Sequence, residues 1–419
     1  MQITRPLGYS EVVESCLNLI SPHNIVITGE INKLLDKSVL KKALQNIKIT
    51  NPMLNLNVTT REGFYDFNFV DEDSEIRTQY YKQDDIDIEK MVSDLISYQL
   101  TMDNSPLAML VQVECKSQTI LFMVFQHLIS DGISAMHVFL ELIEQIDIIM
   151  NEEKPDKILK VLAPALDDFL YNEKIIVNNK NFQKISYDYN SDGIRMNERY
   201  TGVMHMALNL AETEHLLNVS KAFETTATST LSALISKIMF NNLEQMEPQP
   251  GIRCKILVNL RQYLNNEVKQ NDLGFYSGCI KVPLYELQEI SKMAKMVQYE
   301  IKEFLDNGIH LKNSMYNRQL INESRNIEHF AKLIEEKNSC VGLSNMGIIQ
   351  RKNYKNFELL NIHIACDTHI YDRTKNNFFV CANTYKGELK MNFLYPQPVF
   401  TNDRMITIIS QLKDAIRTL

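Results

Sequence analysis

The stretch Gln126-His127-Leu128-Ile129-Ser130-Asp131-Gly132 lies where one predicted element ends and the next begins. Residues 119–126 before it are mostly apolar, which is typical of a strand buried on both faces. Residues 133–149 after it carry apolar side chains at the helical period, which predicts a helix. A histidine at such a junction leaves the end of a buried strand, and its ring can project into a cleft.

His127 is the candidate general base, because a neutral imidazole accepts a proton near neutral pH. Asp131 lies at the start of the predicted helix, where free backbone N–H groups and the helix dipole favour a carboxylate. We therefore expect Asp131 to be structural and not a nucleophile. Gly132 has no Cβ, so it permits unusual dihedrals or the close approach of a slender ligand. The spacing of His127 and Asp131 alone is common by chance and does not identify an active site.

Strand and helix signals alternate on the N-terminal side of this stretch. A helix is predicted to begin at Asp36 and to end before Asn51-Pro52, a helix-ending dipeptide. The chain reverses around Lys116-Ser117-Gln118, which predicts an antiparallel hairpin. The strands expected here cover residues 23–30, 56–60, 64–70, 76–81, 107–114 and 119–126, and a further helix is expected at 86–98.

The same alternation returns after a segment of different composition. Residues 151–200 are rich in Asn, Lys, Asp and Tyr and show weak periodicity, so they are predicted to connect two halves. At 419 residues the chain exceeds the size at which a single core stops growing. We expect an α/β protein with an N-terminal half at 1–165, a connection at 166–200, a C-terminal half at 201–419, and a ligand channel between the halves. The C-terminal half is expected to contain strands at 202–210, 253–259, 277–283, 340–349, 358–365, 377–384 and 388–395, and helices at 213–241, 287–305, 326–336 and 403–419.

Composition and charge exclude several classes of protein. The apolar fraction of 45% and the charged fraction of 23% are those of a globular chain and not of a disordered or membrane-spanning one. A net charge of −8 disfavours adhesion to nucleic acid or to anionic lipid. The N-terminus has no apolar targeting region, no apolar run is long enough for a membrane span, and seven scattered cysteines do not suit a disulfide framework. We therefore expect a cytoplasmic protein with reduced thiols, with no nucleic-acid partner and no membrane span.

Other catalytic and cofactor motifs do not occur. The chain has no Gly-x-Ser-x-Gly elbow for a serine nucleophile, no glycine loop for a phosphate or a dinucleotide, and no His-Glu-x-x-His zinc motif. Asp367 and His369 could together hold a metal ion, but no third close ligand is evident. We therefore expect no bound metal and no bound cofactor.

Residues 126–132 resemble the His-x-x-x-Asp-Gly active-site motif of the chloramphenicol-acetyltransferase-like superfamily, which includes the condensation domains of peptide synthetases. The chain looks nearest to the alcohol acetyltransferases and polyketide-associated acyltransferases of that superfamily. Many condensation domains have a histidine where this chain has Gln126, which favours a free-standing acyltransferase. Further similar segments follow in the same order: Pro6-Leu7-Gly8-Tyr9-Ser10-Glu11, Asn51-Pro52-Met53-Leu54, Val258-Asn259-Leu260-Arg261, Leu273-Gly274-Phe275-Tyr276 and Ser344-Asn345-Met346-Gly347.

The resemblance implies two chloramphenicol-acetyltransferase-like halves, each a mixed sheet flanked by helices, that form a pseudo-dimer around a channel. His127 would lie midway along the channel, with donor and acceptor entering from opposite faces. Asp131 would form an ion pair with a distant arginine, for which Arg261 is the candidate. The alternative is that Arg261 is a surface residue at a strand end. The candidates for contact with substrate are Gly132 on the donor path and Ser344 and Asn345 near the channel, where they could donate or accept hydrogen bonds.

The implied function is transfer of an acyl group from a thioester to a hydroxyl or an amine, giving an ester or an amide. The donor would be an acyl-CoA or an acyl carrier protein, and the acceptor a small alcohol or amine in secondary metabolism, that is, lipid or natural product biosynthesis. We expect the enzyme to be a monomer. The alternative is a catalytically inactive condensation-like module that docks carrier proteins or other partners. The joint presence of His127, Asp131 and Gly132 favours the enzyme, since a decaying site has little reason to keep all three.

Overall fold

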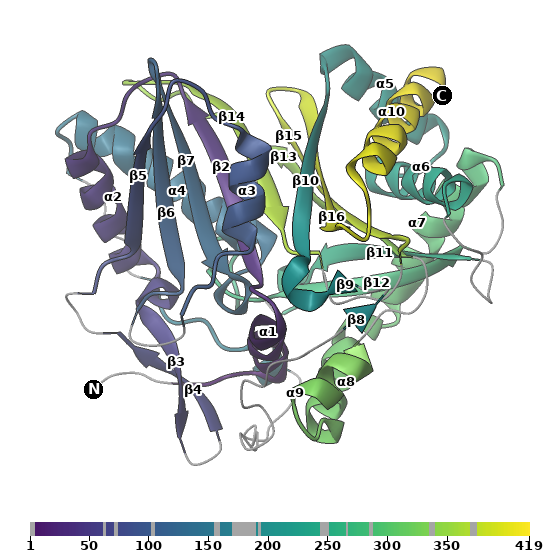
Figure 1. Cartoon of the computed structure of the whole chain (residues 1–419), viewed down its shortest axis with the longest axis horizontal. Coiled ribbons are helices and arrows are strands. Elements are labelled where there is room, and N and C mark those ends of the chain that lie inside the picture. Colours follow the sequence, from purple (N-terminus) through teal and green to yellow (C-terminus); the bar gives the residue numbers. More distant parts are fainter. Residues whose placement is uncertain are drawn as a thin grey trace.

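The structure is a computed structural model of the chain, in which two lobes lie side by side (Figure 1). Each lobe is built on its own sheet with helices packed against it, so the protein is a mixed α/β fold, as expected. Much of the expected connection at 166–200 falls outside the described residues. The structure describes residues 5–61, 64–70, 74–101, 105–154, 160–169, 190–191, 194–243, 251–264, 267–284, 288–334, 340–368 and 375–419.

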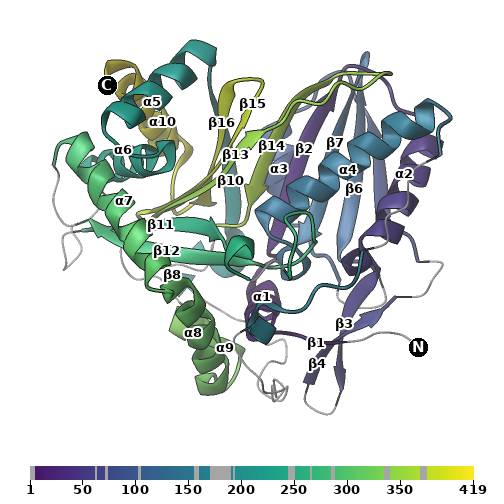
Figure 2. The ribbon, with the colours of Figure 1, turned by 180° about the vertical axis from the view of Figure 1, so that it is seen from behind.

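The first lobe contains a five-stranded sheet in the order β14-β2-β7-β6-β5. β7 (Gln118–Gln126) lies at its centre, antiparallel to both β2 (Asn24–Ile31) and β6 (Ala108–Cys115), and is buried from its second residue onward. Figures 1 and 2 show that α4 (Gly132–Met150) covers one face of this sheet and α3 (Ile88–Ile96) the other. The side chains of β7 are apolar because both faces of the strand are covered. The remaining elements of this lobe are α1 (Tyr9–Ile20), α2 (Lys37–Thr50), β5 (Arg77–Lys82) and β14 (Leu359–Cys366), with a small sheet of β1 (Arg5–Pro6), β4 (Phe64–Phe69) and β3 (Leu56–Arg61).

The second lobe contains a six-stranded sheet in the order β10-β16-β15-β13-β11-β12. Helices α5 (Leu210–Ala222), α6 (Ala227–Asn241), α7 (Ile290–Asp306) and α10 (Asn402–Thr418) gather on one side of this sheet (Figure 1). Apolar residues of these helices and of the strands form the core of the lobe. The strands are β10 (Tyr200–Leu208), β11 (Ile252–Asn259), β12 (Ser277–Leu284), β13 (Cys340–Ile349), β15 (Asn377–Tyr385) and β16 (Glu388–Gln397), with a separate short pair of β8 (Asn190–Ser191) and β9 (Ile194–Arg195). The remaining helices are α8 (Ile309–Glu323) and α9 (Ile327–Ile334).

Two expectations about helices are corrected by the structure. The single helix expected at 213–241 is wrong, because α5 ends at Ala222 and Glu224 takes a left-handed conformation with φ of 57°. Thr226 then caps α6 by accepting a hydrogen bond from the Ser229 N–H (3.2 Å). α8 was not predicted, since its apolar residues are scattered among polar ones.

β14 joins the two lobes. Although it follows β13 of the second lobe in sequence, it pairs antiparallel with β2 at the edge of the first sheet. Side chains of the second sheet reach its backbone, since Asn383 Nδ2 donates to the Ile362 carbonyl (3.2 Å) and the Tyr385 hydroxyl to the Leu359 carbonyl (3.0 Å). The boundary between the lobes in space therefore does not follow a single boundary in the sequence.

Two further observations concern the class of protein. None of the described helices combines the length and the apolar character needed to cross a bilayer. The cysteines are free thiols, with Cys16, Cys254, Cys340 and Cys381 buried and Cys115, Cys279 and Cys366 partly exposed.

Candidate active site

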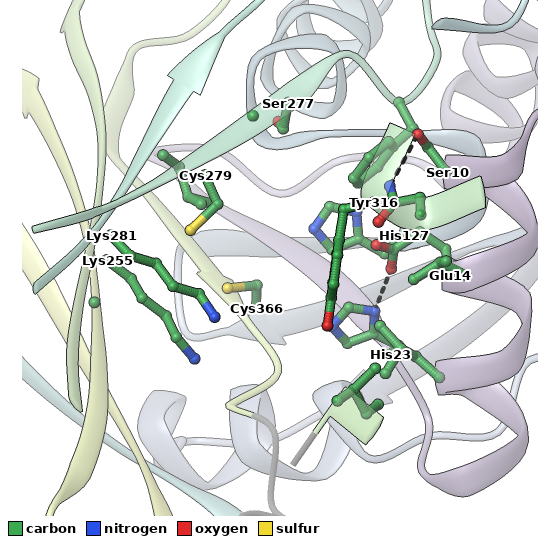
Figure 3. Close-up of a pocket in the computed structure, with 18 of the residues that line it drawn as sticks. Ser10, Glu14, His23, His127, Lys255, Ser277, Cys279, Lys281, Tyr316 and Cys366 are labelled. Carbon is green, nitrogen blue, oxygen red and sulfur yellow. Dashed lines mark hydrogen bonds and ion pairs between the residues drawn. The ribbon is translucent and has the colours of Figure 1, made fainter. Parts of the chain in front are cut away.

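His127 follows β7 directly and begins a short 3-10 turn, His127–Ile129, that leads toward α4. Its N–H donates to the His23 carbonyl oxygen (2.8 Å), which extends the pairing of β2 with β7 beyond the strands. The half-buried ring lines a cavity of about 780 Å³ between the lobes (Figure 3). Parts of α1, α8, β11, β12 and the end of β14 form the other walls.

A second histidine and a glutamate lie beside His127. The rings of His23 and His127 are stacked with their centroids 4.9 Å apart, and Nδ1 of His23 lies 2.6 Å from Oε2 of Glu14 (Figure 3). Phe275 packs on the His127 ring at a centroid distance of 5.3 Å. Neither Glu14 nor His23 was predicted as a site residue, because one comes from α1 and the other from the start of β2, and no local pattern relates them.

Burial and mutual charge set the ionisation of these groups. Burial opposes protonation of His23, but Glu14 and then Asp367 raise the pKa of His23 above its ordinary value. Burial likewise opposes ionisation of Glu14, but His23 and His127 lower the pKa of Glu14. For His127, burial lowers the pKa below its ordinary value. Glu14 acts to raise this pKa and His23 acts to lower it further, and the net change is downward. The arrangement favours an ionised Glu14–His23 pair beside a neutral His127.

One nitrogen of the His127 ring, Nδ1, is buried in the protein. This atom has no hydrogen-bond partner among the described residues. The ring is held instead by stacking on His23 and by contact with Phe275.

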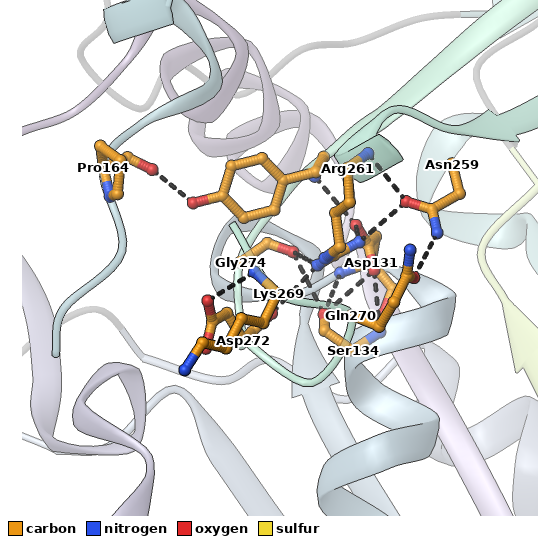
Figure 4. Close-up of polar contacts among 10 residues, drawn as sticks. Asp131, Ser134, Pro164, Asn259, Arg261, Lys269, Gln270, Asp272 and Gly274 are labelled. Carbon is orange, nitrogen blue, oxygen red and sulfur yellow. Dashed lines mark hydrogen bonds and ion pairs between the residues drawn. The ribbon is translucent and has the colours of Figure 1, made fainter. Parts of the chain in front are cut away.

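Asp131 caps α4, and both oxygens of its carboxylate accept hydrogen bonds from other groups of the protein (Figure 4). Oδ1 accepts hydrogen bonds from the Ser134 N–H (2.9 Å) and hydroxyl (3.0 Å). Oδ2 accepts from Arg261 Nη1 (2.7 Å) and from the Tyr276 N–H (2.9 Å). Burial opposes ionisation, but Arg261 and the backbone donors hold the pKa of Asp131 below its ordinary value. The carboxylate is therefore committed to structure.

Arg261 lies just after β11 and is only 1% exposed, so the alternative that it is a surface residue is wrong. Besides Asp131, its guanidinium donates through Nη2 to the carbonyl oxygens of Asp272 (3.1 Å) and Gly274 (3.2 Å). It also lies over the Tyr276 ring, 4.7 Å from the centroid. Arg261 thus holds the loop before β12 against the start of α4, and three of the segments that resemble the superfamily, 126–132, 258–261 and 273–276, meet here.

Gly132, Ser344 and Asn345 do not line the cavity that contains the His127 ring. A Cβ on Gly132 would come within 2.9 Å of the Met346 sulfur, so β13 passes close to the start of α4. Ser344 is buried, and Asn345 Nδ2 donates to the Thr228 hydroxyl (3.2 Å). The structure brings this segment to Gly132 through Met346 and not through its polar side chains.

The described part of the chain contains no cluster of three or more side chains placed to hold a metal ion. His369, one of the two residues considered for a metal, lies outside the described residues. Asp367 lines the cavity, accepts a hydrogen bond from the Thr201 hydroxyl (2.8 Å), and has a pKa raised by burial.

Comparison with protein-family models and with curated proteins finds no match to this sequence. Solved structures do match. Polyketide synthase associated protein 5 from Mycobacterium tuberculosis is 14% identical, with a TM-score of 0.70 over 98% of this chain and 97% of that chain. Trichothecene 15-O-acetyltransferase TRI3 from Fusarium sporotrichioides is 12% identical, with a TM-score of 0.71 over 99% and 95% of the two chains. The first condensation domain of the CDA synthetase is 11% identical, with a TM-score of 0.70 over 99% and 95%. Similarity over whole chains at such low identity establishes a shared fold.

Proposed function

Since the chain has the two-lobed fold of the chloramphenicol-acetyltransferase-like superfamily, we propose that it is an acyltransferase with His127 as its general base. The observation that carries this proposal is the His127 ring at the wall of the cavity between the lobes, with its pKa lowered by burial. A general base must be unprotonated at the working pH and within reach of a substrate proton, and this placement supports both.

The proposed reaction needs one base and no covalent enzyme intermediate. His127 takes the proton of an acceptor hydroxyl or amine while the oxygen or nitrogen attacks the thioester carbonyl carbon. The tetrahedral intermediate then expels the thiolate as the C–S bond breaks, and the imidazolium returns its proton to the sulfur. An ester or an amide and a free thiol leave, and His127 is neutral again. The His23 cation disfavours protonation of His127 and the Glu14 anion favours it, so this pair tunes the base.

The donor is proposed to be an acyl-CoA or an acyl carrier protein, and the acceptor a small alcohol or amine. The structural neighbours include a polyketide synthase associated protein, an O-acetyltransferase and a condensation domain, which supports a place in lipid or natural product biosynthesis. A phosphopantetheine arm is slender, and a cavity of about 780 Å³ has room for such an arm and a small acceptor. The enzyme is proposed to act as a monomer in the cytoplasm without a bound cofactor.

Thioester consumption with a panel of alcohols and amines tests the proposal. We expect His127→Ala to lower turnover roughly 10²- to 10⁴-fold with little change in melting temperature. His215→Ala, a change of an exposed histidine on α5, is the matched control and should leave turnover unchanged. Equal turnover in the His127→Ala variant would contradict the mechanism.

The same assay separates the enzyme from the inactive docking module. A module that only docks carrier proteins would bind an acylated carrier protein yet release no thiol with any acceptor. The wild-type protein would then behave like the His127→Ala variant.

A further inference from the structure

Two cysteines from different sheets meet beside the cavity. Cys366 is the last residue of β14 in the first sheet, and Cys381 lies within β15 of the second sheet. Both are free thiols, and their Sγ atoms are 3.5 Å apart, close enough for a weak hydrogen bond between them. Two side chains whose sulfur atoms are in contact point toward one another, which is a geometric requirement of a disulfide.

The fold holds this pair of sulfur atoms together. The backbone of Cys366 pairs with Ile25 of β2, and Cys381 lies between β13 and β16 in the second sheet. Asn383 and Tyr385 follow Cys381 on β15, and their side chains donate to the β14 backbone and keep the two strands together. A disulfide is about 2.05 Å long, so the sulfur atoms must approach by about 1.5 Å, a movement within the range of side-chain rotation.

The two thiols differ in their access to the cavity. Cys366 is partly exposed and lines the cavity, where Figure 3 shows its thiol among the other lining side chains. Cys381 is only 2% exposed and belongs to the apolar core that contains the first sheet. A small reagent in the cavity therefore reaches Cys366 first, and Cys381 is in contact with the sulfur that has been modified.

The contact between the thiols also affects the ionisation of Cys366. The hydrogen bond with Cys381, together with burial, raises the pKa of the Cys366 thiol well above its ordinary value. The thiolate is the form that attacks a disulfide, and below the pKa its fraction rises roughly 10-fold with each unit of pH. We therefore expect Cys366 to react slowly near neutral pH and faster as the pH rises.

We propose that Cys366 and Cys381 form a redox-active dithiol that reacts with low-molecular-weight disulfides in the cavity. The Cys366 thiolate attacks one sulfur of the incoming disulfide, forms a mixed disulfide and releases one small thiol. Cys381 then attacks the Cys366 sulfur and releases the second small thiol. The two protein thiols give up two electrons and two protons, and the incoming disulfide takes them up as two thiols. The product is a covalent bond between β14 and β15.

The proposed acyl transfer releases a slender thiol into the same cavity, so the disulfide of a pantetheine arm is the class of oxidant that fits it. The inference rests on the proposed function only for this choice of oxidant, because thiol–disulfide exchange needs no turnover. Pantethine, the disulfide of pantetheine, is therefore the main probe, and the smaller hydroxyethyl disulfide is the second. Each probe is incubated with the full chain, and intact mass and peptide mapping identify the products.

We expect wild-type protein to form a Cys366–Cys381 disulfide with both probes, roughly 10-fold faster for each unit by which the pH is raised. Dithiothreitol should reverse the reaction. Cys381→Ala should stop at the mixed disulfide on Cys366, and Cys366→Ala should leave Cys381 unmodified. Cys115→Ala, a change at the end of β6 away from the lining residues, is the matched control and should form the disulfide as wild type does.

The oxidised protein should also melt at a temperature a few degrees higher than the reduced protein, because the new bond restricts the unfolded chain. Dithiothreitol should abolish this shift. A melting temperature that does not change when the disulfide is present would contradict the link between β14 and β15.

The dithiol is overturned if neither probe gives the disulfide, if Cys366 of the wild-type chain keeps a stable adduct, or if Cys366 pairs with Cys279, another cysteine of the cavity wall. Reaction with hydroxyethyl disulfide but not with pantethine overturns the pantetheine disulfide as the oxidant. Failure of the proposed function has a different signature. In that case wild-type protein consumes no thioester with any acceptor, while the Cys366–Cys381 disulfide still forms.

Discussion

His23 lies between a carboxylate and the candidate base, and this order gives each group its charge. Glu14 holds the proton on His23, and the resulting cation, together with burial, disfavours a proton on His127. Because the pKa of His127 is lowered, the base stays neutral as the pH falls below the ordinary imidazole range. Activity that depends on it should therefore be lost on the acid side, at a pH below the usual value for histidine.

His23→Gln tests this coupling. The amide can still donate to Glu14, but the positive charge is gone while the attraction of Glu14 for a proton on His127 remains. We expect the pKa of His127 to rise, so the acid limb of the pH–rate profile moves to higher pH. The profile of kcat/KM measures this shift. An unchanged acid limb, or one moved to lower pH, would show that His23 does not act on the base.

The same substitution, His23→Gln, should also change the free energy of unfolding, by an amount that depends on pH. The folded pKa of His23 is raised, so its contribution to stability is fully present below the unfolded value of about 6.5 and is lost as the pH rises through the folded value. His23→Gln should therefore destabilise most at low pH and least at high pH. Denaturant melts across this range provide the measurement, separately from activity.

The ion pair of Asp131 and Arg261 is nearly free of solvent, with side-chain exposures of 2% and 1%. Removing one partner of such a pair leaves the other buried without compensation. We expect Asp131→Asn to lower the free energy of unfolding by about 3–5 kcal/mol. Adding Arg261→Met should recover part of that loss. A double-mutant cycle by urea denaturation measures the coupling, and purely additive losses would refute the pairing as a stabilising unit.

At the scale of elements, the turn between β7 and α4 is packed against β13. A Cβ on Gly132 would approach the Met346 Sδ to 2.9 Å and the Ile364 Cδ1 to 3.1 Å. The methionine end is flexible and can move, whereas a branched side chain would also press on β14. Gly132 is therefore needed for close packing at the start of the helix, whatever its relation to the donor path.

Gly132→Val should lower the free energy of unfolding by about 1–3 kcal/mol through overpacking. Met346→Ala in the same chain should restore part of it by making room. Urea denaturation of the single and double variants measures this, and KM values for donor and acceptor are measured on the same proteins. If the donor KM is still raised when Gly132→Val is combined with Met346→Ala, and the acceptor KM is unchanged, the donor path lies at Gly132. Equal changes in both KM values that disappear with Met346→Ala would leave it a packing residue only.

At the scale of the whole molecule, β14 makes the two lobes one structure. It completes the first sheet next to β2, and β15 of the second sheet donates side-chain hydrogen bonds to it from Asn383 and Tyr385. Its apolar residues also contribute to the core that contains the first sheet. Neither lobe is therefore formed by a continuous half of the sequence.

This arrangement predicts a single calorimetric unfolding transition for the wild-type chain. Asn383→Leu with Tyr385→Phe removes two buried donors to β14, at a cost of about 1–3 kcal/mol each, and should broaden or split the transition. Tyr395→Phe is the matched control, since its hydroxyl bonds to Asn402 within the second lobe. The control should shift the midpoint without splitting it. A transition that stays single and sharp in the double variant would contradict the role of β14.

Features that depend only on neighbouring residues could be predicted from the amino-acid pattern. The apolar run before His127, the helical period after Asp131 and the turn chemistry at Asn51-Pro52 predicted β7, α4 and the end of α2, because local pattern reflects local backbone and one buried face. The resemblance around residues 126–132 also predicted the fold that the solved structures share. Local pattern was misleading at 213–241, where one left-handed residue divides a continuous helical signal into two helices.

Tertiary structure alone decided which distant residues meet. Glu14 and His23 reach His127 because α1 packs beside the end of β7, Arg261 is buried because the loop before β12 folds over it, and β14 returns to the first sheet. A sequence pattern indicates which face of an element is buried, but not which other element covers that face. The charges of the groups at this site depend on which elements meet there.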